Sequence, residues 1–581
     1  MASVVPTSGP EHDFTGVSPH ISSWKVWGRK LLRTWQRMQV SYYGGKYSIH
    51  RVLAFEEYVN NTSFFRVAMV CTWTPLPMVA LVFGQESIPL QELDEGWSVN
   101  YGLWIRAVIL IGIVTYGVVV QGIYLIDDFT VTTCQMFLLV TSVPIAVAGF
   151  SMVMAAFLVF PIPFYAILMI PEFFLALFLA LRVVVGSQAI QQMIDHSDQV
   201  AQCLRFICAQ TSTLVIFPSY EMLFRAAEGT QYQLLVILLL PLIKLATKNI
   251  ILHFAKSLED MIPVEVIFTA DFFNAVYVAT CMQSATSVAA VTAITITDFS
   301  QTFSMLYGLQ RRTTSILSNL HRTVDSAADN DNMLTMLCWL CRHPECFRKQ
   351  SHLGIRKRSC LPHQLSVINK RVLEGLNSIV VDPDNILSGP KLPETSYRLG
   401  ARKPLKNPHA ISPGSDKIQP ADHSKARLQD SGSHRPTILL EVFETLFTTE
   451  CLVVTAYLEA FMPLFYCSYM VVMVNLQSAQ YHTEMKGITR DNVVVTILPL
   501  FVFGLLQIAS CVLLVAMIKR NCGMQAIYQL AFVLESQRSL VQCKMMLWMV
   551  VTLCFRVKHF GVDFKFEFIR LGFPKFWTPH G

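Results

Sequence analysis

The sequence predicts an all-α protein, a polytopic transmembrane helical bundle with about eight to ten membrane helices. The first observation is composition: the 581 residues are 53% hydrophobic and only 15% charged. Soluble chains have roughly 45–50% apolar and about 25% charged residues. The second is that apolar residues gather in runs of about 20, the helical length that crosses a bilayer core. Because lipid offers the backbone no hydrogen bonds, such runs must be helices.

The apolar runs give a set of candidate membrane spans. They cover residues 63–84, 101–125, 131–158, 161–185, 202–225, 231–253, 264–300, 449–475 and 492–517, with a weaker run at 540–556. The segment 264–300 is long enough for either one tilted helix or a tight hairpin. The others each have the length of a single crossing.

A long polar stretch divides these spans into two groups. Residues 345–437 are rich in proline, serine and basic residues, and such a segment cannot bury enough apolar surface to offset the entropy cost of ordering. We therefore expect four regions. Residues 1–62 form a cytosolic segment, 63–300 an N-terminal transmembrane bundle, 301–437 a cytosolic helix followed by a long disordered linker, and 438–581 a C-terminal transmembrane bundle with a cytosolic tail.

The distribution of basic residues predicts the orientation, because cytosolic loops carry an excess of Lys and Arg. Residues 1–62 are basic, whereas the 85–100 loop has four acidic residues and neither Lys nor Arg. The N-terminus is therefore predicted inside and this loop outside. The linker and the C-terminus are basic and also predicted cytosolic. This assignment requires segment 264–300 to cross twice or not at all.

The segment 24–38 near the N-terminus is predicted to be a basic amphipathic helix. Its tryptophans share one face and its basic residues the other, namely Trp24, Trp27, Trp35, Arg29, Lys30 and Arg33. This pattern favours contact with anionic lipids at the membrane surface. The alternative is a cytosolic cap packed on the bundle. Membrane lipids are thus the predicted partners, and a net charge of +6 is too small to indicate nucleic-acid binding.

Polar residues within the apolar runs are the candidate functional residues: Glu172, Asp271, Asn274 and Glu459. A charge at the bilayer centre costs at least about 2.5–3.5 kcal/mol, so it needs a partner or a hydrated cavity. In one interpretation these groups line an ion or solute path. In the other they pair with Arg66, Arg106, Arg205 or Lys244 and only hold helices together. A shared hydrated cavity would favour the first, and individual pairing the second.

The predicted cytosolic region 301–437 also holds four residues that could bind zinc: Cys338, Cys341, Cys360 and His363. Four such ligands form tetrahedral zinc sites in other proteins, but no glycine follows either pair to shape a knuckle. Acylation of the cysteines and inert thiols are the alternatives. Most other cysteines lie within apolar runs, where a thiol behaves as a small hydrophobic group, so no structural disulfides are expected. No motif implies a cofactor.

Several short strings resemble a family of uncharacterised multi-pass transmembrane proteins of oomycetes. They include KLATKN at 244–249, the stretch 272–283, LAFVLESQ at 530–537 and HFGVDF at 559–564. The resemblance covers most of the chain except the linker. It implies a multi-pass membrane fold and supplies neither an activity nor site residues.

Two functions follow as hypotheses from the sequence. The first is a solute or ion transporter whose mid-membrane site includes the acidic residues named above. The second is a non-transporting membrane scaffold or receptor that acts through its cytosolic linker. An enzyme is the least favoured class, because the sequence has no P-loop, no dinucleotide fingerprint, no zinc-protease motif and no nucleophile elbow.

Overall fold

The computed structural model describes residues 45–227, 229–230, 232–255, 260–285, 287–324, 332–348, 354–377 and 438–562. Every regular element in these ranges is helical, and one isolated bridge joins His482 and Val557. The predicted all-α fold is confirmed. The predicted lipid-contacting helix, with Trp24, Trp27, Arg29, Lys30, Arg33 and Trp35, lies outside the described residues, as do residues 378–437 and 563–581.

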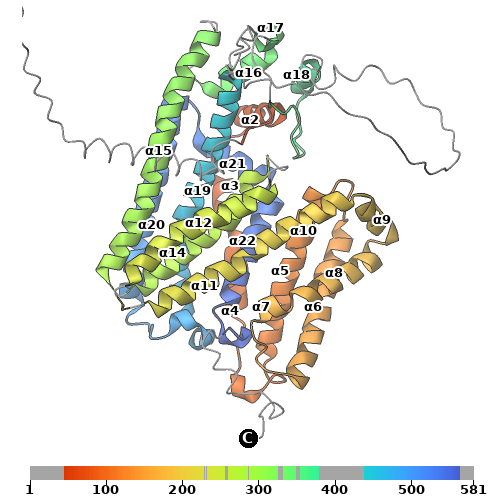
Figure 1. Cartoon of the computed structure of the whole chain (residues 1–581), viewed down its shortest axis with the longest axis vertical. Coiled ribbons are helices and arrows are strands. Elements are labelled where there is room, and N and C mark those ends of the chain that lie inside the picture. Colours follow the sequence, from red (N-terminus) through yellow and green to blue (C-terminus); the bar gives the residue numbers. More distant parts are fainter. Residues whose placement is uncertain are drawn as a thin grey trace, which may run out of the picture.

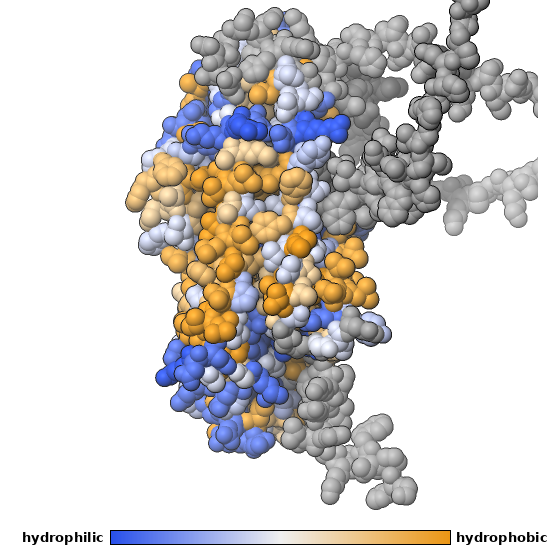
Figure 2. Space-filling view, turned by 90° about the vertical axis from the view of Figure 1, so that its left-hand side faces the viewer, coloured by the Kyte–Doolittle hydropathy of each residue, from blue (hydrophilic) through white to orange (hydrophobic). Residues whose placement is uncertain are grey.

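An apolar band crosses the face of the molecule shown in Figure 2, where hydrophobic side chains lie between two hydrophilic ends. Seven helical stretches in the described residues are long and apolar enough to cross a membrane. They are α3–α4 (Phe64–Glu86), α5 (Tyr101–Leu125), α6 (Thr133–Phe157), α10–α11 (Ser197–Ala226), α12 (Gln233–Ala255), the rod Ile262–Ser284 and α20 (Val493–Cys522). These helices fit a multi-pass membrane protein.

Four more helices run along this bundle (Figure 1). They are α8 (Ile170–Val184), which follows the short α7 (Tyr165–Leu168), and α15 (Val288–Val324), α19 (Ile438–Met473) and α22 (Arg538–Cys554). Two short helices, α9 (Ser187–Asp195) and α21 (Ala526–Ser536), connect longer ones. Most of α19 and α22 is buried, so these two helices form the centre around which the lipid-facing helices pack.

The predicted span 264–300 is two helices rather than one. The rod Ile262–Ser284 consists of α13 (Ile262–Val266), a π-helical segment η2 (Ile267–Asp271) and α14 (Phe272–Ser284). The chain then turns and continues as α15, which packs against α14 and α12. Within α13–α14 almost every side chain is buried, as expected of a helix that is hydrophobic on all sides. The hairpin interpretation is therefore the one that the fold adopts.

A polar cap covers one end of the bundle. It consists of α2 (Ile49–Asn61), α16 (Met333–Arg342), α17 (Pro344–Arg348) and α18 (Val367–Asn377), at the top of Figure 1. The side chain of Ser48 caps α2 by accepting a hydrogen bond from the backbone amide of Arg51. The amide of Ile49 donates to the Arg356 carbonyl. Residues 354–377, which the sequence assigned mostly to a disordered linker, are therefore ordered where they bind α2.

The two ends of the described chain lie at opposite ends of the bundle. Residues 45–62 belong to the cap, whereas 555–562 lie beside the loops at the far end (Figure 1). There the Phe164 amide donates to the carbonyl of Gly561, and His559 Nε2 lies 2.7 Å from the Gln91 carbonyl. Gly561 has φ +65°, and a Cβ there would meet the Ile162 carbonyl at 2.0 Å, so only glycine allows this approach.

The termini themselves, residues 1–44 and 563–581, lie outside the described residues, so the expectation that both share one side stays a prediction. The opposite placement of residues 45–62 and 555–562 favours the alternative, and it arises at α22, which the sequence shows only as a weak apolar run. Lys544 lowers the hydropathy of that run, yet its ammonium lies 2.6 Å from the Glu265 carboxylate. A paired lysine can be buried, and α22 is therefore a complete pass through the bundle.

We expect epitope tags to report opposite sides for the two ends. A tag before Met1 and a tag in the linker near residue 410 should become accessible together after selective permeabilisation. Tags after Gly581 and in the 87–100 loop should share the other side. Immunofluorescence with and without detergent measures this. A C-terminal tag on the linker's side would contradict the arrangement.

Candidate functional site

Charged side chains from three helices meet in the middle of the bundle. Lys244, near the midpoint of α12, has its Nζ 2.8 Å from Glu459 Oε1 on α19 and 3.4 Å from Asp271 Oδ1. Lys248, one turn further along α12, lies 2.7 Å from the same Asp271 oxygen. The hydroxyl of Thr455 donates to Asp271 Oδ2 at 3.1 Å. All four charged groups are at least nine-tenths buried.

A third carboxylate, Asp298 on α15, completes this central charge cluster. It accepts a hydrogen bond from the Gln507 side chain on α20, and it lies within electrostatic range of Lys244, Glu459 and Asp271. Among the described residues, no ion pair joins Asp298 to a basic side chain. The cluster, defined as Lys244, Lys248, Asp271, Asp298 and Glu459, therefore has three carboxylates for two lysines. Its formal charge is −1 when all five groups are ionised.

The helices that carry the cluster are irregular next to it. Pro241 lies within α12 three residues before Lys244, and Pro463 within α19 four residues after Glu459. The π-helical segment ends at Asp271 itself. An internal proline removes a backbone hydrogen bond and kinks the helix, and π-helical turns inside α-helices occur frequently at functional sites. The cluster therefore lies where three helices can bend.

Two small cavities border the cluster. One of about 30 Å³ is lined by Asn274 and Asp298 together with Tyr220 and Thr297. Another of about 20 Å³ is lined by Glu459, Thr455 and Gln507. A cavity needs roughly 10–15 Å³ of such space to hold one water, together with polar partners. Each cavity therefore has room for about one or two waters beside a carboxylate.

The structure brings together three of the four predicted intramembrane residues. Asp271 and Glu459 belong to the cluster, and Asn274 lines the cavity beside Asp298. Glu172 does not join them and is a correction to the predicted site. It lies in the first turn of α8, where Pro171 begins a helix rather than interrupting one. One of its carboxylate oxygens is buried without a hydrogen-bond partner among the described residues.

The sequence pattern did not predict two members of the cluster, Lys248 and Asp298. Lys244 and Lys248 are both buried inside the bundle, because the cluster's carboxylates neutralise them. The sequence does contain an indication of Lys248, because it follows Lys244 by four residues and residues four apart in a helix share a face. Lys244, proposed as a pairing partner for the acidic residues, does pair with Glu459.

Other buried charges form separate, balanced pairs. Arg106 bonds Glu86 at 2.7 Å, with His482 3.0 Å from the same carboxylate. Lys544 pairs with Glu265. Arg556 pairs with Glu484, and the partly exposed Arg225 pairs with Glu221. None of these groups has more carboxylates than basic side chains, and this separates them from the central charge cluster with its excess carboxylate.

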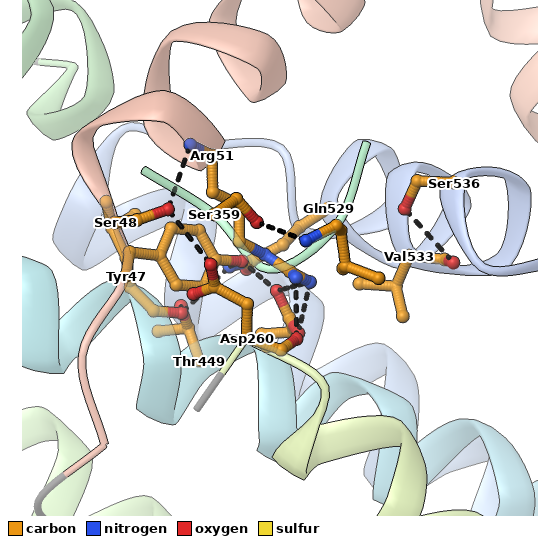
Figure 3. A network of polar contacts seen from close by, with 12 residues as sticks. Tyr47, Ser48, Arg51, Asp260, Ser359, Thr449, Gln529, Val533 and Ser536 are labelled. Atoms are coloured by element: carbon orange, nitrogen blue, oxygen red, sulfur yellow. Dashed lines mark hydrogen bonds and ion pairs between the residues drawn. The ribbon is translucent and has the colours of Figure 1, made fainter. Parts of the chain in front are cut away.

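A polar network joins the cap to the bundle (Figure 3). The Arg51 guanidinium binds both oxygens of Glu450 on α19, at 2.8 and 2.9 Å, and the Asp260 carbonyl at 2.7 Å. The hydroxyl of Tyr47 donates to Glu450 and accepts from the Gln529 amide of α21. Arg51 and Glu450 are fully buried. The pair therefore attaches α2 to α19 in a region closed to water.

The four candidate zinc ligands do not assemble into a site. Within the described residues, no three His, Cys, Asp or Glu side chains lie together as a metal would require. Cys338 and Cys341 are buried on α16, whereas Cys360 lies in the loop before α18 and is exposed. The ring of His363 stacks on Phe532. The zinc interpretation is not supported, and burial removes Cys338 and Cys341 from acylation.

Comparisons of the whole chain with protein-family models, with curated proteins and with solved structures gave no match. The resemblance to multi-pass proteins of oomycetes therefore stays a prediction.

We expect Arg51→Met to lower the free energy of unfolding by about 3–5 kcal/mol, because it leaves Glu450 buried without its cation. The measurement is denaturant unfolding of the purified protein in detergent micelles. The matched control is Arg66→Met. Arg66 pairs with Glu535 but is 61% exposed, so its loss should cost at most about 1 kcal/mol. Equal effects of the two variants would contradict the assigned role of Arg51.

We expect Cys341 to resist alkylation in the folded protein. Burial raises the pKa of its thiol to about 12, so the reactive thiolate is scarce at pH 8 and becomes common only as pH approaches that value. Mass spectrometry after iodoacetamide treatment should show Cys360 and Cys134 modified first. Full modification of Cys341 before unfolding would show that α16 does not pack as described.

Proposed function

We propose that the protein is a proton-coupled solute transporter whose coupling site is the central charge cluster. The observation that carries this proposal is the imbalance of the cluster, in which three carboxylates face two lysines in the middle of the bundle. One proton on Asp298 makes the cluster neutral. A metal cation is less suited to this place, because it requires several oxygen ligands and those of Asp271 and Glu459 already meet Lys244 and Lys248.

The cost of burying charge supports a functional role. Each ion taken from water into a low-dielectric interior loses several kcal/mol, which a partner only partly restores. Apolar side chains can hold helices together without this loss of hydration free energy. Ionisable residues within a membrane therefore mark ion and substrate pathways by default. Elsewhere this bundle buries a carboxylate together with one matching cation, as the pair of Glu265 and Lys544 shows.

The cluster suggests how protonation and movement are linked. With Asp298 ionised, the excess negative charge favours an arrangement in which water reaches the cavity beside Asn274. With Asp298 protonated, the remaining two carboxylates match the two lysines, and the site can close without an unpaired charge. The proline positions in α12 and α19 and the π-helical segment provide bending points for the change between these arrangements.

A second candidate is a non-transporting membrane scaffold, and the pairing of the acidic residues favours it. Asp271 meets Lys248 at 2.7 Å, and Glu459 meets Lys244 at 2.8 Å. If these pairs only fix the packing of α12 against η2 and α19, the working surface is the cap and its linker. The two candidates differ in whether protons cross the membrane.

We expect wild-type proteoliposomes to acidify a lumen loaded with a pH-sensitive dye. The outer buffer is acidic and contains a mixture of amino acids, sugars and nucleosides, with valinomycin and potassium setting the potential. Asp298→Asn should lower the rate to that of empty liposomes, because it removes the exchangeable proton. Asp298→Glu should retain flux, since it keeps a carboxyl group.

The matched control is the double variant Glu265→Gln/Lys544→Met, which removes a balanced buried pair outside the cluster. It should retain flux if it elutes as a monodisperse protein. Flux that depends on external Na⁺ rather than on pH would contradict proton coupling. Wild-type protein that is folded but no faster than empty liposomes would favour the scaffold.

A further inference from the structure

An elongated apolar cavity lies apart from the central charge cluster. It has a volume of about 110 Å³ and lies between α5, α6, α8, the α10–α11 junction and α22. Its walls are mostly aliphatic and aromatic, as Leu110, Val114, Val118, Phe173 and Leu214 illustrate. Pockets of this character bind small apolar molecules, with a few polar groups fixing their orientation.

One side chain that lines the cavity has a hydrogen-bond donor without an acceptor. Trp548 on α22 lines the cavity, is 4% exposed, and its indole Nε1–H has no partner in the described part of the chain. Buried donors are almost always paired, because an unpaired one costs about 1–3 kcal/mol. The orphaned indole therefore points to a ligand that supplies an oxygen acceptor at this position.

The other polar groups in the wall are neutral. Gln121 and Gln210 lie at one end, where Gln121 Nε2 donates to Gln210 Oε1 at 3.0 Å and Gln210 Nε2 donates to Glu265 at 2.8 Å. Neither Lys nor Arg is among the lining residues, and Lys544, four residues before Trp548, is already paired with Glu265. A charged ligand would have no counterion here, so the ligand's oxygen belongs to an uncharged group.

The dimensions favour a single chain. The lining residues of α5 extend from Leu110 to Gln121, which is ~16 Å along a helix axis. A volume of about 110 Å³ spread over that length leaves a narrow channel. Such a channel has the width of an alkyl chain and not that of a fused ring system.

The surroundings indicate that the ligand enters from the bilayer. Helix α8 packs chiefly on α6 and α9 rather than on α10 or α11. Both α8 and α11 expose large apolar side chains, including Phe178, Leu179, Val215 and Leu223. These exposed apolar side chains beside the cavity place its entrance toward the bilayer and not toward water.

We propose that this cavity binds one single-chain membrane lipid with an uncharged oxygen, such as a long-chain alcohol or a monoacylglycerol. The chain fills the channel along α5, and its hydroxyl or carbonyl oxygen accepts the hydrogen bond from Trp548 Nε1–H. This site is separate from the central charge cluster, and its test does not depend on transport.

The experiment uses the full-length protein in phosphatidylcholine nanodiscs with a diazirine-bearing analogue of hexadecanol. After photolysis, mass spectrometry should place the label on peptides of α5, α8 and α22. Unlabelled hexadecanol should compete. Hexadecanoate, which is charged, and cholesterol, which is too wide, should not. Competition by either of them equal to that of hexadecanol would overturn the proposed ligand class.

Two variants test the site itself. Trp548→Phe keeps the ring and removes the donor, and should weaken labelling roughly two- to ten-fold, the range of one net hydrogen bond. Val114→Trp fills the channel and should abolish labelling. The matched control, Val512→Trp on α20, adds the same bulk at a side chain that is 62% exposed to lipid and should change nothing. Labelling that survives both cavity variants would show only bulk lipid around the protein and would overturn the proposal.

Discussion

The need to neutralise buried charge determines how this bundle packs. Lys244 and Lys248 of α12 are held by carboxylates from η2 and α19, so the distant α19 must lie beside α12 and η2. Breaking one such buried pair costs about 3–5 kcal/mol, which is a large part of the stability of an ordinary domain. Apolar contacts fill the space between the helices, but the ion pairs decide which helices are neighbours.

The same constraint acts at both ends of the bundle. In the cap, Arg51 joins α2 to α19 and to the segment before α13. At the far end, Arg106 and His482 share the Glu86 carboxylate, and Arg556 binds Glu484. Each of these groups connects distant parts of the sequence. They stabilise the fold without leaving an excess carboxylate, and this balance separates them from the central charge cluster.

The central charge cluster and the apolar cavity are both connected to the π-helical segment. A chain of hydrogen bonds runs from Gln121 through Gln210 to Glu265. Lys544 pairs with Glu265 and also donates to Thr269 of η2, two residues before Asp271. A π-helical turn has weaker backbone bonding than the α-helix around it. The segment that presents Asp271 is thus also in contact with the wall of the lipid cavity.

Length and hydropathy of the apolar runs were enough to predict the helical membrane fold, and the cost of isolated charge was enough to select Asp271 and Glu459. Hydropathy scores each residue by itself, so it could not assign Lys248, Lys544 or Asp298. Their positions depend on partners supplied by other helices. The tertiary structure decided those pairings, and with them the hairpin at 264–300, the full pass of α22 and the separation of Glu172 from the site. The physical reason is that burying an ion pair requires a counterion from a distant segment. The local sequence pattern around a charged residue does not show which distant segment will supply that counterion.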